Sequence, residues 1–167
     1  MPGTLTLGVL DIRHGAEVTS AALRTARCVT LFLLLGIASL SNSALAEQTP
    51  SPAGAEEYII WPPDGAVIHG GKLWVRMGLR NMGVCPKGVA VPNTGHHHLL
   101  IDADLPALDQ EIPSDRNHLH FGAGETDARI ELPPGKHTLQ LILGDHNHVP
   151  HVPPVYSKKI TITVLKD

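Results

Sequence analysis

The sequence has few cysteines, few aromatic side chains and no strong excess of charge. Its 167 residues include two cysteines, and aromatic residues make up 4% of the chain. Two cysteines cannot form a disulfide framework, so the fold must depend on a hydrophobic core. The formal net charge is −3 and the basic residues are scattered, which argues against binding to nucleic acid or to anionic membrane surfaces.

One long apolar run is present, and it lies near the N-terminus. Arg24 and Arg27 precede the run CVTLFLLLGIASL, which leads into SNSALA and then Glu47. Basic residues, an apolar segment and small residues in this order are typical of a signal peptide, with cleavage expected after Ala46. The run is shorter than the roughly 20 residues that span a bilayer, and no later segment is longer.

Cleavage at this position defines the expected domains. Residues 1–46 are predicted to be a helical signal segment, residues 47–57 a flexible leader of small and polar residues, and residues 58–167 a single histidine-rich domain. The part before the apolar run is unusually long for a signal peptide, and a start codon misassigned upstream is one explanation. We expect the mature chain to be periplasmic or secreted, without insertion into a membrane.

The apolar pattern after residue 58 is that of β-strands. In KLWVRMGLR, at 72–80, Leu73, Val75 and Met77 recur with a period of two. The same alternation returns in KHTLQLIL and in KKITITV, and the turn sequences PPDG, HGG and PPG separate the segments. We therefore predict an all-β fold, a small antiparallel sandwich of the immunoglobulin or fibronectin type.

Histidine is the residue type that is most concentrated. Eight of the eleven histidines fall in three short stretches, HHH at 96–98, HLH at 118–120 and GDHNHVPH at 144–151. Imidazole is the commonest protein ligand for zinc and copper, and an exported protein with few thiols would use histidines on adjoining loops. The density of histidine therefore favours a site for copper or zinc.

The spacing within the three stretches also fits a metal site. Alternate residues of an extended strand share a face, so His96 and His98 point together, as do His118 and His120. Three such pairs on neighbouring loops would supply more than the three or four ligands that one site needs. The candidate ligands are His96, His98, His118, His120, His146, His148 and His151.

Neighbouring polar residues are predicted to have supporting roles. His97 points away from the other two histidines of HHH and shares a face with Leu99, so we expect a buried, hydrogen-bonded side chain. Asp102 and Asp145 are candidate acceptors that would fix the tautomer of a ligating imidazole. His137, at the start of a strand, is expected to be structural or exposed.

Sulfur ligands are less well supported. Met77, Met82 and Cys85 lie in VRMGLRNMGVCPKG, and a thioether or thiol beside imidazoles would favour copper(I) over zinc. Met77 alternates with the core positions of its strand, so we expect it to pack in the core. Met82 and Cys85 lie in a loop, where both roles stay open.

The stretches PNTGHHHLLIDADLP, RNHLHFG and LQLILGDHNHVPH occur together, and in this combination the chain resembles an uncharacterised bacterial family, domain of unknown function 4399. The likeness extends from about Ile60 to Val164. It implies an exported, single-domain, mostly β protein in which these histidines are the recurring polar signature. Members of the family tend to carry Ala where this sequence has Cys85, so the resemblance implies no essential role for the thiol.

Three functions are consistent with these features. The first is an exported protein that binds copper or zinc through clustered histidines. The second is a metal-free module that binds an envelope protein or a glycan, in which the histidines form a hydrogen-bond network. Its aromatic side chains for sugar would come from Trp61, Trp74, Tyr58 and Tyr156, although the strand pattern predicts that several of them lie in the core. The third, a metal-dependent enzyme, is less well supported because no carboxylate has distinctive spacing and no G-x-S-x-G motif is present.

Overall fold

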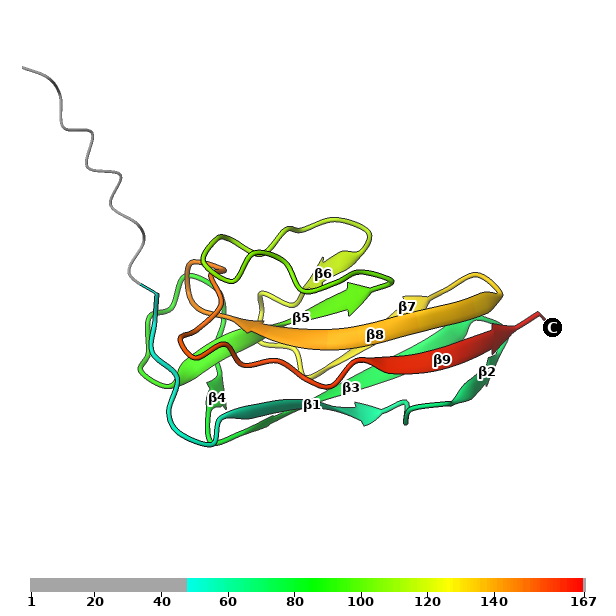
Figure 1. Ribbon diagram of the computed structural model, residues 1–167, viewed down its shortest axis with the longest axis horizontal. Coiled ribbons are helices and arrows are strands. Elements are labelled where there is room, and N and C mark those ends of the chain that lie inside the picture. The colour runs from blue at the N-terminus through cyan, green and yellow to red at the C-terminus, as the bar shows by residue number, and fades with distance from the viewer. Residues whose placement is uncertain (1–47, 167) are drawn as a thin grey trace, which may run out of the picture. The chain divides into compact units, whose positions relative to one another are not determined.

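The computed structural model describes residues 48–166, and their regular elements are strands (Figure 1). The strands are β1 Glu56–Trp61, β2 Val67–His69, β3 Lys72–Arg80, β4 Gly83–Val84, β5 Thr94–Ile101, β6 His118–His120, β7 Asp127–Glu131, β8 Gly135–Gly144 and β9 Ile160–Leu165. The expected signal segment lies outside the described residues. Within 48–166, no helix has the length and hydrophobicity needed to cross a membrane.

The strands form two sheets (Figure 1). The smaller sheet has the antiparallel order β1-β3-β7. The larger has the order β2-β9-β8-β5-β4, and β6 pairs with β5 beside β4. This arrangement of a three-stranded sheet against a sheet centred on β9, β8 and β5 is that of an immunoglobulin or fibronectin sandwich. The predicted all-β sandwich is therefore confirmed, although the short pairs β2–β9 and β4–β5 are parallel.

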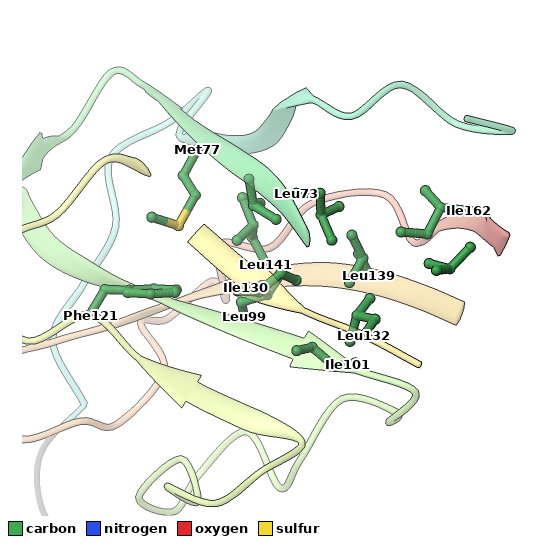
Figure 2. Packing of buried hydrophobic residues seen from close by; sticks show 12 residues of the cluster. Leu73, Met77, Leu99, Ile101, Phe121, Ile130, Leu132, Leu139, Leu141 and Ile162 are labelled. Carbon is green, nitrogen blue, oxygen red and sulfur yellow. The ribbon is translucent and has the colours of Figure 1, made fainter. Parts of the chain in front are cut away.

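The hydrophobic core lies between the two sheets (Figure 2). From the smaller sheet, Leu73, Val75 and Met77 of β3 point inward, so Met77 packs in the core as predicted. Leu99 of β5 and Leu141 of β8 meet them from the larger sheet. Each fully buried side chain of this size contributes roughly 1.5–3 kcal/mol to the free energy of unfolding.

The central strand β5 is buried on both faces, unlike β3. Every residue from Gly95 to Ile101 is buried. On the side away from the core, Leu100 packs with Ile142 of β8 and with Ile112 of the segment that connects β5 to β6. That segment therefore covers the outer face of the larger sheet, and it encloses polar residues of β5 as well as apolar ones.

The N-terminal part of the described chain is hydrogen-bonded to the domain. The amide of Ser51 donates to Val152 O over 2.9 Å, and the amide of Val152 donates to Thr49 O over 3.0 Å. Strand β1 already begins at Glu56. The prediction of a flexible leader over 47–57 does not fit these contacts, because small polar and proline residues also suit an edge segment whose backbone groups pair with another loop.

Candidate metal centre

Four imidazole rings converge on the outer face of the larger sheet. His96 and His98 come from β5, His120 comes from β6, and His148 comes from the loop after β8. Five of the six ring pairs have centroids 4.7–5.0 Å apart, and His98 and His148 are 6.1 Å apart. We call these four residues the histidine cluster. All three histidine-rich stretches contribute to it, so they meet in space.

Strand geometry places three of the four rings. His96 and His98 are two residues apart on β5, so both side chains leave the sheet on the same face. The antiparallel pairing of β5 with β6 puts His120 directly opposite His98. Side chains at such opposite positions start about 4.5–5.5 Å apart at their Cβ atoms, close enough for the rings to approach one ion.

Two glycines provide the space that the rings occupy. A Cβ at Gly144, which lies opposite His96 in β8, would be 2.9 Å from Nε2 of His98. A Cβ at Gly122 would overlap the ring of His120. Neither glycine has a positive φ, so the site needs their small size and not their backbone freedom.

The fourth ring, His148, is positioned by a tight loop that is anchored on Asp145. Oδ1 of Asp145 accepts hydrogen bonds from the amides of Asn147 (2.8 Å) and Val149 (3.0 Å), and Oδ2 accepts one from Thr49 Oγ1 (2.7 Å). The backbone of His148 has a φ of 64°, in the left-handed region that residues other than glycine seldom adopt. Such conformations persist where surrounding contacts hold them, and they occur often at functional sites.

The most unusual property of the cluster is the state of its nitrogen atoms. Both ring nitrogens of His96 and of His98, and Nε2 of His120, are buried and have no hydrogen-bond partner within residues 48–166. A buried polar group left in this state costs roughly 1–3 kcal/mol. A network of structural hydrogen bonds therefore does not describe these three rings, whereas their lone pairs are available to a metal ion.

The ring positions are compatible with one ion. His96, His98 and His120 each offer a nitrogen, and these three atoms lie within 4.8 Å of one another. Zinc to nitrogen bonds of about 2.0–2.1 Å would separate the nitrogens of a tetrahedral site by about 3.4 Å. Side-chain rotations that shorten the nitrogen to nitrogen separations by up to about 1.5 Å would bring all three nitrogens within bonding distance of one ion.

Burial keeps three rings of the cluster, those of His96, His98 and His120, in the neutral form. Desolvation, followed by the neighbouring His120 and His148, lowers the pKa of His96 to about 4. Desolvation and the neighbouring imidazoles lower the pKa of His98 to about 2. The pKa of His120 is also lowered, mainly by burial. Because a metal ion binds the neutral imidazole, these three rings are ready to bind at neutral and mildly acidic pH.

Three of the predicted ligands lie outside the cluster. His118 donates through Nδ1 to Asp115 Oδ1 over 2.9 Å. His151 is buried and donates through Nε2 to the carbonyl of Thr94 over 3.1 Å. The ring of His146 accepts a hydrogen bond from the amide side chain of the next residue. Each of these three rings has a hydrogen-bond partner in the protein, although Nδ1 of His151 has none, whereas no nitrogen of His96 or His98 has one.

The two aspartates that were predicted to orient ligating imidazoles make other contacts. Asp102 accepts hydrogen bonds from His137 Nδ1 (2.7 Å) and from the amide of Thr138 (2.8 Å), so it joins the end of β5 to β8. The hydrogen bonds of Asp145 hold the His148 loop, and none goes to a ring of the cluster. Asp145 therefore acts on the site through the backbone of the loop.

His97 is buried and hydrogen-bonded, as predicted from its position in HHH. Its Nδ1 lies 2.6 Å from Oε1 of Glu57 in β1, and neither side chain is exposed. Burial raises the pKa of Glu57 to about 7, although the hydrogen bond to His97 acts in the opposite direction. The pair joins β5 to β1 on the core side, directly behind the cluster.

Sequence reasoning missed Gly122, Gly144 and Thr49. A signal existed for Gly144, because a glycine at the end of the apolar strand LQLILG suggests a close approach by another group. Gly122 follows HLHF, and the same argument applies to it. Nothing in the sequence indicates that Thr49 contacts a loop 96 residues further along the chain.

Comparisons with known proteins give a family but no function. No curated protein sequence matches the chain. Among solved structures, the fibronectin(III)-like modules of Clostridium thermocellum CbhA are similar over 66% of this chain and 96% of that chain, with 13% identity and a TM-score of 0.38. Residues 75–165 match the family described as Domain of unknown function (DUF4399), and this stretch contains the whole histidine cluster. The chain belongs to the DUF4399 family.

Proposed function

We propose that this protein binds one copper(II) or zinc(II) ion through the histidine cluster. His96, His98 and His120 would be ligands, and His148 would complete the set. The observation that carries the proposal is that five buried imidazole nitrogens of the cluster have no hydrogen-bond partner in residues 48–166. An ion at their centre would coordinate one nitrogen from each ring and so remove much of the cost of their burial.

The donor atoms favour copper(II) or zinc(II) over copper(I). Imidazole suits both divalent ions, whereas copper(I) prefers sulfur. Met77 packs in the core, and Cys85 Sγ lies 3.6 Å from the carbonyl of Val89 in its own loop. Within the described part of the chain, the metal-competent group consists of imidazoles alone.

Binding fits the donor set better than catalysis does. Four imidazoles would fill a tetrahedral coordination shell, while a catalytic zinc keeps one position for water or substrate. A catalytic metal usually also has a general base beside it. Glu111 lies 3.7 Å from Nδ1 of His148, but its side chain is largely exposed and it approaches the edge of the cluster.

The proposed site of action is outside the cytoplasm, in the periplasm or the medium. The basic residues, apolar run and small residues that precede Glu47 support export. The single cysteine of residues 48–166 is free, and all of the ligands are histidines, which bind metal without the thiolates that an oxidising compartment would convert to disulfides.

Titration calorimetry of the metal-stripped protein with zinc(II), and then with copper(II), tests the proposal. We expect one ion per chain and, at a ligand concentration of about 100 times Kd, a rise in the melting temperature of roughly 10 °C. His120→Gln should weaken binding by more than about tenfold, because it removes one ligand. His146→Gln is the matched control, since its ring lies outside the cluster.

Two results would contradict the proposal. One is the absence of stoichiometric binding by either ion. The other is equal affinity in the His120→Gln and His146→Gln proteins, because the ion would then be held somewhere other than in the cluster.

A further inference from the structure

The outer face of the three-stranded sheet exposes both tryptophans of the chain. Trp61 is 47% exposed, Trp74 is 53% exposed, and the neighbouring Ile60 is 55% exposed. Each would contribute to stability if it were buried, since aromatic rings bury a large apolar area. A group of exposed apolar side chains on a folded domain commonly marks an interaction site.

A β-bulge in β1 brings Trp61 onto this face. Ile59 pairs with Met77 of β3, but Trp61 pairs with Arg76, so β1 contains one extra residue at Ile60. Without the bulge, Trp61 would lie opposite a buried residue of β3 and would point into the core. Bulges frequently re-aim a side chain at a functional site, and here the bulge leaves Ile60 and Trp61 both exposed.

The exposed side chains surround a shallow groove. Ile60, Trp61, Trp74 and Arg76 line a hollow of about 330 Å³. Trp61 and Trp74 lie on adjacent strands at diagonal positions, which long aromatic side chains can bridge, so one extended molecule can touch both rings. A second hollow of about 270 Å³ is lined by residues of β3 and β7, among them Arg129, which is opposite Trp74.

Cations alternate with the aromatic rings along this face. Lys72 and Arg76 flank Trp74 on β3, and Arg129 lies across from it on β7. None of these three cations takes part in an ion pair within residues 48–166. Asp127 and Glu131 lie opposite Arg76 and Lys72 in the sheet, but neither forms a salt bridge with them. The three cations are available to an anionic ligand.

We propose that this face binds an acidic polysaccharide, with Trp61 and Trp74 as stacking platforms and with Arg76 and Arg129 donating hydrogen bonds to its carboxylates. A uronic acid ring presents an apolar C–H face and a carboxylate on its edge within one sugar unit. Tryptophan packs against the first and guanidinium hydrogen-bonds the second. A protein partner would require a wider dry apolar centre than these three apolar side chains provide.

The proposed polysaccharide site is independent of the histidine cluster. The cluster lies on the outer face of the larger sheet, and the tryptophan face belongs to the other sheet, with the hydrophobic core between them. Binding of polysaccharide should therefore not require a metal ion, and failure of one proposal would leave the other standing.

Calorimetric titration of the full chain with a hexamer of galacturonic acid, in buffer with a chelator, tests this inference. We expect binding that weakens as sodium chloride is added, because the carboxylate contacts are screened. Trp74→Ala and Arg76→Gln should each weaken binding by about tenfold. Val91→Ala, which also removes an exposed apolar side chain, is the control, and His98→Leu should leave the binding unchanged.

Three outcomes would overturn the inference. The hexamer does not bind; or it binds the Trp74→Ala and Val91→Ala proteins with equal affinity; or a neutral glucose hexamer binds the chain as tightly as the acidic one. Trp74, Arg76 and Val91 are exposed, so circular dichroism should find these three variants folded, and Arg76→Gln keeps the comparison valid if Trp74→Ala does not fold.

Discussion

At the scale of single residues, His98 has properties that do not favour stability. Its side chain is fully buried, and neither ring nitrogen has a hydrogen-bond partner within the described chain. Replacing such a group by an apolar side chain of similar size removes the penalty for burying unpaired polar atoms. Residues that lower the stability of a fold are typically kept for a function, which here would be metal binding.

The substitution His98→Leu separates a ligand from a structural residue. We expect the melting temperature of the metal-free protein to stay the same or to rise by a few degrees, about 1 kcal/mol in stability, because two orphaned nitrogens are removed. The increase in melting temperature on adding zinc should be lost. Scanning calorimetry with and without zinc measures both effects. A metal-free variant that melts far below the parent protein would indicate a structural role.

The substitution Gly122→Ala tests the space around His120. The added methyl group would overlap the His120 ring and displace it from the other three imidazoles. We expect zinc affinity to fall by about 10–100-fold while the protein remains folded. Gly83→Ala is the control, because its methyl group would meet only Thr94 Cγ2, at 3.3 Å. Equal zinc affinities in the two variants would show that the position of the His120 ring does not matter.

At the scale of elements, the strands were predictable and their pairing was not. Alternation identified β3, β8 and β9, and the same period placed His96 and His98 on one face and His97 on the other. Convergence with His120 depends on the register of β6 against β5, and a shift of one residue would turn its ring to the opposite face. Sequence does not determine that register.

The loop that carries His148 was beyond prediction for a different reason. Its conformation rests on hydrogen bonds to Asp145, and one of them comes from Thr49, in a segment that the sequence suggested was flexible. The sequence pattern alone does not show which of His146, His148 and His151 joins the cluster. The positive φ of His148 and the partners of the other two rings distinguish them, and these follow from tertiary contacts.

The substitution Thr49→Val tests whether the N-terminal segment positions His148. It removes the hydrogen bond to Asp145 with little change in side-chain volume, so the loop should lose one of its anchors. We expect zinc affinity to fall by about tenfold, as is typical when an outer support of a metal ligand is lost. Ser51→Ala is the control. Ser51 lies in the same N-terminal segment as Thr49, but its Oγ donates to Pro153 O and makes no hydrogen bond to Asp145. Similar affinities in both variants would mean that His148 needs no such anchor.

At the scale of the whole molecule, the fold uses its two sheets differently. The larger sheet is covered on its outer face, where the histidine cluster is buried, and the smaller sheet exposes its outer face with both tryptophans. The low cysteine content correctly indicated a fold that depends on its core. The exposure of Trp61 could not be anticipated, because it requires a bulge that regular alternation does not reveal.

The buried imidazoles should make the metal-free protein sensitive to acid. The pKa of His96 is lowered to about 4 and that of His98 to about 2, so below pH 6.5 the unfolded chain binds protons that the folded chain does not. These two histidines therefore lower the stability as the pH decreases from about 6.5 towards 4, by up to about 1.4 kcal/mol per pH unit for each, and the raised pKa of Glu57 offsets part of this loss. Urea unfolding at pH 7.5 and pH 5 measures the loss, which should be smaller in His98→Leu. A constant stability over this range would contradict the lowered pKa values.

The measurement that tests the central claim most directly is X-ray absorption at the zinc edge of the zinc-loaded protein, because it identifies the atoms bound to the ion. We predict a shell of about four nitrogen atoms at about 2.0–2.1 Å, with the outer-shell scattering of imidazole rings. A shell with sulfur at about 2.3 Å, or one of oxygen atoms without imidazole scattering, would contradict a metal site in the histidine cluster.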